Sequence, residues 1–376
     1  MKKNDTIKHT IRLAISVSLI GFVSACTMGK DYVKPEIKTP AAFKETKDWK
    51  VGSPKDDARG DAWWTVFNDP KLNELEEKVT VSNQTIVIAA AQFRQAKAAV
   101  QAAKAGYFPG ISAGASASRS RKSDNVKGSS GSLNSDFMLP ASVSWEVDLW
   151  GKVRRAVEAS KAGMQASAAD LAAVRLGVQA ELAQDYFQIR TLDSEKKNLD
   201  TTVSLYAKSY DMTKNRYTSG IVSKSDVLQA ETQLKSVQAQ VIDLGVQRAQ
   251  LEHAIALLTG QAASDFSMAF SPLETTPPPI PVGVPSSLLE RRPDIASAER
   301  HVASANAQIG AAQAAYYPNI TLSATGGFES STISKLLDWP SHFWSIGPSI
   351  GGTIFDGGLR SAQKQQAMAV YDASVA

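Results

Sequence analysis

Few side chains in this sequence have the types and spacing that catalysis or metal binding requires. The single cysteine, Cys26, excludes an internal disulfide framework and a cysteine-rich metal site. The four histidines lie far apart, without the HExxH spacing of a zinc site. They are His9, His253, His301 and His342. The sequence therefore predicts neither a metal site nor a cofactor.

A pair of carboxylates is the best candidate for acid–base chemistry. Glu146 and Asp148 are two residues apart, which places them on one face of a strand, as a hydrolase pair could be. The alternative is that both are polar residues facing a water-filled interior or its base. Because no pocket-forming pattern surrounds them, we favour the alternative and predict that the protein is not an enzyme.

Two other runs could bind anions. The run Asp356–Gly358 lacks the flanking strand and helix of a phosphate-binding loop, so we interpret it as a turn. Arg291 and Arg292 stand near a predicted helix start, where an anion could bind. Ion pairs with Glu290, Asp294 or a neighbouring helix are the alternative that we favour.

The composition limits the class of protein. The chain has 376 residues, 43% of them hydrophobic and 21% charged, so it can bury a sizeable core. Its formal net charge of +4 arises mainly from residues 1–25, and the rest of the chain is almost neutral. The charge distribution therefore gives no support to a nucleic-acid partner.

Residues 1–25 have the pattern of a lipoprotein signal peptide. Basic residues precede the apolar stretch Ile11–Val23, which is too short for an ordinary transmembrane helix. The sequence Val-Ser-Ala before Cys26 resembles a bacterial lipobox, which implies cleavage before Cys26 and acylation of its thiol and new amine. Thr27 rather than Asp follows, which by the same resemblance permits delivery to the outer membrane. The alternative is an ordinary signal peptide with an incidental cysteine.

The chain contains an internal repeat at an offset of 209 residues. The segment that begins at Asn83 matches the segment that begins at Arg292. Matched positions include Tyr107 with Tyr316 and Pro109 with Pro318. Each copy predicts an alanine-rich helix that ends at two aromatic residues and a proline, because proline cannot continue a helix.

Alternating apolar and small polar residues follow each copy of that helix. The four segments cover 111–118, 137–149, 320–324 and 344–354, with a Ser/Gly/Asn-rich loop at 122–135. Their period of two and lengths near ten are typical of transmembrane β-strands, although a soluble amphipathic hairpin is the alternative for each one alone. Four strands cannot close, and open edges are unstable in lipid, so three chains would have to pool twelve strands.

Two long helices are predicted after the first pair of strands. The stretch from Lys152 to about Tyr217 has apolar residues at three- and four-residue steps and no proline. A turn at Thr218–Gly220 and a return helix with coiled-coil spacing follow, interrupted at Arg248 and closed at Thr259–Gly260. The alternative is an antiparallel coiled coil that serves only as a strut.

The boundaries between these parts follow from helix caps and from proline-rich linkers. Asp69 precedes Pro70 as an N-cap would, and Ser287–Glu290 predicts a capping box. The predicted parts are a signal peptide (1–25), a lipidated extended segment (26–68), a first repeat with helix, hairpin and long helix pair (69–270), a proline-rich linker (271–285), and a truncated second repeat (286–376).

Six stretches resemble the outer membrane factor family, the TolC/OprM-like channels, in its lipoprotein (NodT-type) branch. They are KDYVKPE (30–36), WWTVFNDPKL (63–72), WEVDLWGKVRR (145–155), RYTSGIVSKSDVLQAE (216–231), PSSLLERRPDIASAE (285–299) and IFDGGLR (354–360). The resemblance covers essentially the whole chain after the signal peptide.

The resemblance implies a mixed α and β membrane protein in the outer membrane of a Gram-negative bacterium. Four transmembrane strands per chain would contribute to a homotrimeric, 12-stranded β-barrel, which a long antiparallel α-helical barrel continues into the periplasm. The implied function is passive exit of small amphiphilic compounds from an inner-membrane RND-type pump and its periplasmic adaptor, with outer-membrane lipid around the barrel. The alternatives are the duct of a protein secretion system and a lipid-anchored coiled-coil spacer without a pore.

The resemblance also assigns the turn between the long helices. Gly220, Ile221, Val222, Ser223 and Asp226 correspond to the tip that meets the adaptor. Glycine there also has a purely structural explanation, because it makes the turn.

The second repeat is expected to be incomplete at its C-terminus. The first repeat continues far past its Leu-Trp-Gly motif, whereas the second stops at Ala376, before a second long helix pair. The family's acidic periplasmic aperture lies largely on that pair, so no gate residue is assigned. We expect this sequence to be a fragment, and a product that ends at Ala376 to be unable to close a stable trimeric helical barrel.

Overall fold

A computed structural model describes residues 27–34, 62–125, 131–273, 278 and 292–376. The signal peptide, Cys26, Arg291 and the predicted capping box at Ser287–Glu290 therefore lie outside the described residues. The chain divides into two compact units. Unit 1 comprises the described parts of Met1–Ile37, Arg94–Ser167 and Ala296–Ala376, and unit 2 those of Lys38–Phe93 and Ala168–Ile295.

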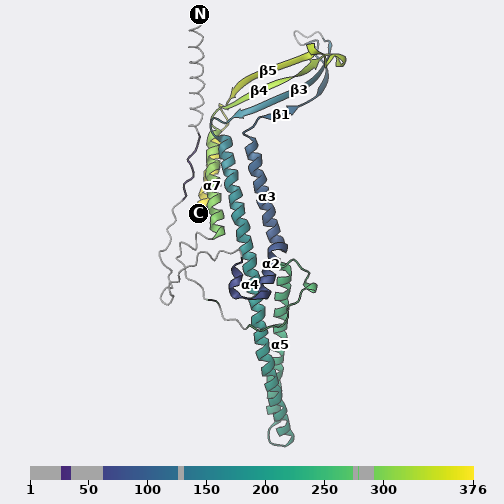
Figure 1. Ribbon diagram of the computed structural model, residues 1–376, viewed down its shortest axis with the longest axis vertical. Helices are drawn as coiled ribbons and strands as arrows, with labels where there is room; N and C mark the ends of the chain where they lie inside the picture. Colours follow the sequence, from purple (N-terminus) through teal and green to yellow (C-terminus); the bar gives the residue numbers. More distant parts are fainter. Residues whose placement is uncertain (1–26, 35–61, 126–130, 274–277, 279–291) are drawn as a thin grey trace. The chain divides into compact units, whose positions relative to one another are not determined.

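Unit 1 contains an antiparallel sheet (Figure 1). Its strands among the described residues are β1 (Gly110–Ala113), β2 (Ser116–Arg121), β3 (Leu133–Val147), β4 (Asn319–Ser330) and β5 (His342–Gly351). The order is β1-β3-β4-β5, and β2 also pairs with β3. Because β1 and β2 pair with consecutive parts of β3 in one register, they form one interrupted line. The sheet therefore has four lines of strands, as the alternating segments predict.

The break between β1 and β2 has a local cause in β3. The N–H of Gly114 donates to the carbonyl of Pro140 at 2.9 Å. In an antiparallel pair, the residue opposite Gly114 would normally donate a second hydrogen bond from its own N–H. Pro140 has no N–H, so this bond is missing and the ladder is interrupted there. Toward β4 the ladder is continuous through Pro140, which pairs with Gly327.

The ends of the strands differ from the predicted ones. β3 begins at Leu133, inside the predicted loop, because residues 133–136 pair with residues 118–121 although they do not alternate in polarity. At its other end β3 stops at Val147, so Leu149 lies outside the strand. The carboxylate of Asp148 instead accepts a hydrogen bond at 2.8 Å from the N–H of Arg154, in the first turn of the next helix. Ile354 likewise lies beyond β5, which ends at Gly351.

Helices of unit 1 adjoin the sheet in sequence. They are α7 (Pro293–Ala314), α8 (Leu359–Val375), and the unit 1 parts of α3 (Gln84–Ala105) and α4 (Lys152–Thr218), with short 3₁₀ turns at Ile333–Lys335 and Trp339–Ser341. Both bounds of α7 lie 209 positions after those of α3, the offset found in the sequence. α4 and α7 bury small side chains, and Ser304 of α7 donates a hydrogen bond to the carbonyl of Ala159.

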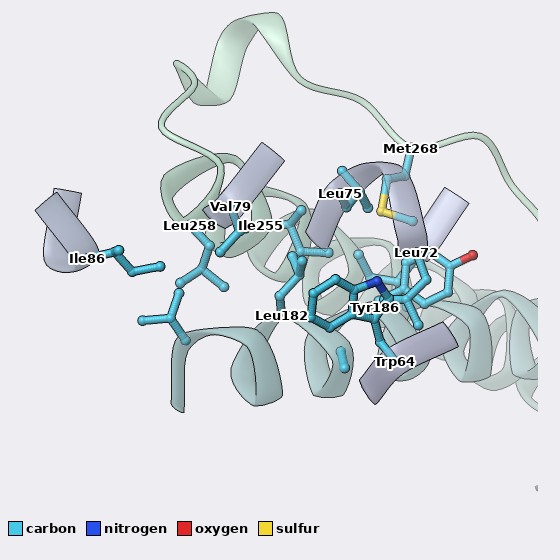
Figure 2. Packing of buried hydrophobic residues seen from close by; sticks show 13 residues of the cluster. Trp64, Leu72, Leu75, Val79, Ile86, Leu182, Tyr186, Ile255, Leu258 and Met268 are labelled. Carbon is cyan, nitrogen blue, oxygen red and sulfur yellow. The ribbon is translucent and has the colours of Figure 1, made fainter. Parts of the chain in front are cut away.

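Unit 2 is built around a helix pair with a small apolar core. It contains η2 (Trp63–Phe67), α2 (Pro70–Ser82), α5 (Lys224–Leu258), η3 (Ala263–Asp265) and the remaining parts of α3 and α4. Figure 2 shows the core, in which side chains from α2, α4 and α5 meet Trp64 and Met268. Its largest fully buried members include Tyr186, Leu72 and Leu182.

Several predicted helix boundaries are confirmed. Asp69 caps α2 by accepting the N–H groups of Lys71 and Leu72, with Pro70 at the first helical position. α4 begins at the predicted Lys152 and ends one residue past the predicted Tyr217, and α5 ends at Leu258, followed by Gly260 at φ +67°. α5 starts at Lys224, four residues after Gly220. No helix among the described residues is long and apolar enough to cross a membrane.

Candidate functional site

The turn between α4 and α5 is built by two overlapping caps. α4 closes with Gly220 in the left-handed region at φ +72°, where its N–H donates to the carbonyl of Tyr217 at 2.9 Å. The N–H of Ile221 reaches back to the carbonyl of Arg216, also at 2.9 Å. These two bonds form a Schellman motif, which requires a residue such as glycine that tolerates positive φ.

The next helix begins immediately with a capping box. The Ser223 hydroxyl accepts the N–H of Asp226, and the Asp226 carboxylate accepts the N–H of Ser223 at 2.9 Å. Hydrogen bonds from the backbone and side chain of Ser223 lower the pKa of Asp226 below its ordinary value. The tip is therefore a well-defined turn that is set by local sequence.

The tip exposes apolar side chains although its backbone is fully capped. Ile221 is 65% exposed, and Tyr217 and Leu228 on the adjoining helix turns are also exposed. Most of the Ile221 side chain is therefore open to solvent rather than buried against its own helix. Exposed apolar side chains on a rigid turn are suited to docking rather than to bond chemistry.

The sheet has one apolar face and one polar face. The pairing register of the strands places one row of apolar residues across all four lines of strands: Ile111, Val143, Ala324 and Ile346. The next row along contains Ser112, Ser142, Thr325 and Ser345. Ile111, Ile346 and Ile350 are more than 70% exposed. In the described part of the chain, neither outer edge of this sheet is paired.

The carboxylates considered for acid–base chemistry have separate partners. Glu146 lies 3.5 Å from the ammonium of Lys152, and Asp148 caps α4. They do not converge on a shared site.

The runs considered for anion binding are also occupied. Arg292 forms an ion pair with Asp294 at 2.6 Å. Gly357 and Gly358 both have positive φ, so the run from Asp356 is a turn, as predicted. Asp356 accepts hydrogen bonds from Gly358 and Arg360, and the Arg360 contact lowers the pKa of its carboxyl group.

Two charged networks were not predicted. In unit 2, Asp193 is fully buried and accepts a hydrogen bond from Arg248 at 2.7 Å. One indication of this buried ion pair was present in the sequence, which is the interruption of the apolar pattern at Arg248. In unit 1, Arg155 is 3% exposed and bonds to the segment that follows Thr27. The described residues contain no group of three or more His, Cys, Asp or Glu side chains that could hold a metal ion.

Comparison with known proteins gives consistent matches over most of the chain. The family model described as outer membrane efflux protein matches residues 76–261 and 284–376. The chain is 29% identical to the probable efflux pump outer membrane protein TtgC of Pseudomonas putida, over 98% of this chain and 76% of the relative. It is 30% identical to nodulation protein T of Rhizobium leguminosarum bv. viciae, over 96% and 74% of the two chains. The solved outer-membrane channel OprN matches with a TM-score of 0.85 and 31% identity, over 93% of this chain and 78% of OprN.

Proposed function

The chain belongs to the outer membrane efflux protein family, and we propose that it is the exit channel of a tripartite efflux system in the outer membrane. Such channels are not enzymes. The proposed channel passively conducts small amphiphilic compounds that an inner-membrane RND-type pump and a periplasmic adaptor deliver to it. The observation that carries the proposal is the two-faced sheet, whose apolar face leaves Ile111, Ile346 and Ile350 exposed among the described residues.

The sheet supports a trimeric barrel. A sheet with one apolar and one polar face is suited to lipid on one side and water on the other. Its two open edges cannot remain unpaired in lipid, so further copies must pair with them. Three chains with four lines of strands each make a 12-stranded barrel, and the hydroxyl row at Ser112 then faces the water-filled interior.

The remaining parts of the chain have roles in the same assembly. The α4–α5 pair contributes to a helical barrel in the periplasm. Residues 1–25 are a signal peptide, and acylation of Cys26 anchors the following segment, 26–68, to the outer membrane. Residues 69–270 and 286–376 are two structural repeats joined by the linker 271–285, a division supported by the common offset of α3 and α7.

Electrical recording tests conduction directly. We expect the purified protein, expressed from the whole reading frame rather than as a product that ends at Ala376, to give discrete single-channel currents in a planar lipid bilayer, because water fills the polar interior of the barrel. A coiled-coil spacer without a pore gives no current at any voltage, and that result would refute the proposal.

Drug susceptibility of a strain that lacks the gene distinguishes small-molecule efflux from the alternative of a protein secretion duct. Loss of resistance to small amphiphiles supports efflux, whereas loss of protein export alone supports a secretion duct.

The tip is the proposed adaptor contact, through Gly220, Ile221, Val222, Ser223 and Asp226. Because Ile221 is exposed, Ile221→Asp leaves folding intact but places a charge in the apolar contact. We expect this variant to reduce drug resistance at least about tenfold in minimal inhibitory concentration, the size of a lost interface contact. Ile221→Leu keeps an apolar side chain and serves as the matched control, with resistance unchanged. Wild-type resistance in Ile221→Asp would place the adaptor contact elsewhere.

A further inference from the structure

The segment Thr27–Tyr32 is held against two helices of unit 1. The N–H of Met28 donates to the carbonyl of Trp150 at 3.1 Å, where β3 passes into α4. Asn306 of α7 donates to the carbonyl of Lys30 at 3.0 Å, and the Tyr32 hydroxyl donates to Glu299 at 3.3 Å. The segment thus joins parts of the chain that are more than a hundred residues apart in sequence.

Arg155 is the centre of these contacts. Its guanidinium donates to the carbonyls of Met28 at 3.1 Å and Gly29 at 2.9 Å. It also pairs with Asp31 at 2.9 Å and with Glu158 at 2.7 Å. The Arg155 side chain is 3% exposed, whereas that of its partner Asp31 is 92% exposed, so the guanidinium is buried beneath the segment while the Asp31 carboxylate stays in contact with water. The planar guanidinium has five N–H donors and can hydrogen-bond to all four groups at the same time, whereas a lysine ammonium has only three.

Two glycines permit the close approach. Gly29 has φ +88°, and a Cβ there would lie 2.6 Å from the Cα of Gly310 in α7. A Cβ on Gly310 would in turn lie 3.0 Å from the side chain of Arg155. Any larger residue at position 29 would both strain the backbone and push the segment away from α7.

We propose that Thr27–Tyr32 is a clasp, locked by Arg155 as a positioning residue, that fixes the point at which the lipid anchor leaves the protein. The inference rests on the proposed acylation of Cys26, which is bonded directly to Thr27. Thr27 accepts a hydrogen bond from Arg154 at 2.6 Å, and Gly151 provides the space beside it. The acyl chains therefore enter the bilayer beside the β3–α4 junction of their own chain.

The aromatic residues at this junction are consistent with a position at the membrane surface. Trp150 stacks on Tyr317 with ring centroids 4.7 Å apart. Its indole N–H donates to the carbonyl of Pro318 at 2.8 Å. Tryptophan and tyrosine favour the interface between lipid tails and water. The clasp thus places the attachment point of the acyl chains at the membrane surface, where the chains enter the lipid.

Distance measurement between two spin labels tests the clasp. Lys30→Cys and Gln308→Cys place labels on exposed residues of the segment and of α7. Cys26 is the only native cysteine and is consumed by acylation, so labels attach only at the new sites. An excess of unlabelled chain keeps about one labelled copy in each assembly. We expect one narrow distance distribution in the parent protein, broadened at least about twofold in Arg155→Lys and in Gly29→Ala.

The controls separate this inference from the proposed anchoring. Arg175→Lys makes the same exchange at an exposed position of α4 and should leave the distribution narrow. Gly29→Ala acts from the segment itself, so a folding defect of α4 cannot explain its effect. Unchanged distributions in both Arg155→Lys and Gly29→Ala would overturn the clasp. Mass spectrometry of the N-terminal peptide tests acylation separately: an unmodified Cys26 would refute the placement of the anchor even if the segment stays docked.

Discussion

Replacing Asp193 with alanine is expected to lower the free energy of unfolding by about 3–5 kcal/mol, the usual cost of leaving buried cations without their partner. Asp193 is fully buried between α4 and α5. Its carboxylate accepts hydrogen bonds from Arg248 at 2.7 Å and from the N–H of Ser271 at 2.9 Å. The variant removes both acceptors and leaves the Arg248 guanidinium partly buried with only Glu252 to balance it.

An exposed ion pair on the same helix is the matched control. Asp200 pairs with Lys196 at 2.6 Å, but both side chains are well exposed. Asp200→Ala should therefore cost less than about 0.5 kcal/mol. Denaturant unfolding at one fixed protein concentration compares the two variants. Equal losses for Asp193→Ala and Asp200→Ala would contradict a special role for the buried network.

The network also secures the segment that follows α5. Met268 donates its N–H to Glu252, Arg190 donates to the carbonyl of Ala269, and Leu273 donates to Ser194. Each of these bonds links the backbone of the segment to a side chain of α4 or α5. We therefore expect faster proteolysis within residues 263–273 in Asp193→Ala, alongside the loss of stability, because this segment loses the hydrogen bond from Ser271 to Asp193.

A second large effect is expected from pH at Glu76. This side chain is fully buried in α2, and neither carboxylate oxygen has a hydrogen-bond partner among the described residues. Burial raises the pKa of Glu76 from 4.5 to about 8. Between pH 4.5 and about pH 8, Glu76 is therefore protonated in the folded state but ionised in the unfolded state. The contribution to stability is fully present below pH 4.5 and is lost as the pH rises toward 8.

The size of this effect follows from the pKa difference. Each pKa unit corresponds to about 1.4 kcal/mol, so Glu76 should cost up to a few kcal/mol of stability between about pH 5 and pH 8. Glu76→Gln carries a permanently neutral amide of similar shape and should remove this part of the pH dependence. Glu77→Gln, at the exposed neighbouring position, should follow the parent curve. Thermal unfolding of all three across this pH range provides the measurement. Parallel curves for the parent and Glu76→Gln would show that Glu76 does not titrate there.

Local structure could be predicted from the sequence because its causes lie within a few residues. Pro70 after Asp69, Gly220 after α4 and Gly260 after α5 set helix ends through their own backbone preferences and caps. The lengths of α4 and α5 follow from apolar spacing without proline. The family likewise follows from short motifs. Adaptor contact at the tip and acylation of Cys26 stay predictions.

Pairing across long sequence separations could not be predicted from the sequence. Period two shows that a segment has two faces, but not which residue of β3 lies opposite β4, some 180 positions away. The aligned hydroxyl row at Ser142 and Thr325 depends on that register. The break in the first strand line depends on it as well, because Pro140 matters only when it faces Gly114.

Three charged residues show most clearly the difference between what the sequence predicts and what depends on tertiary packing. In sequence, Arg155 is one of two adjacent arginines, Asp193 is one acid in a polar stretch, and Glu76 is one of three glutamates in α2. Whether each is solvated, paired or buried depends on which distant segment packs against it. The sequence determined the helices, turns, alternation and family, since neighbouring residues specify these. Only the tertiary structure decided register, buried charge and the docking of Thr27–Tyr32, since these depend on contacts between residues far apart in the chain.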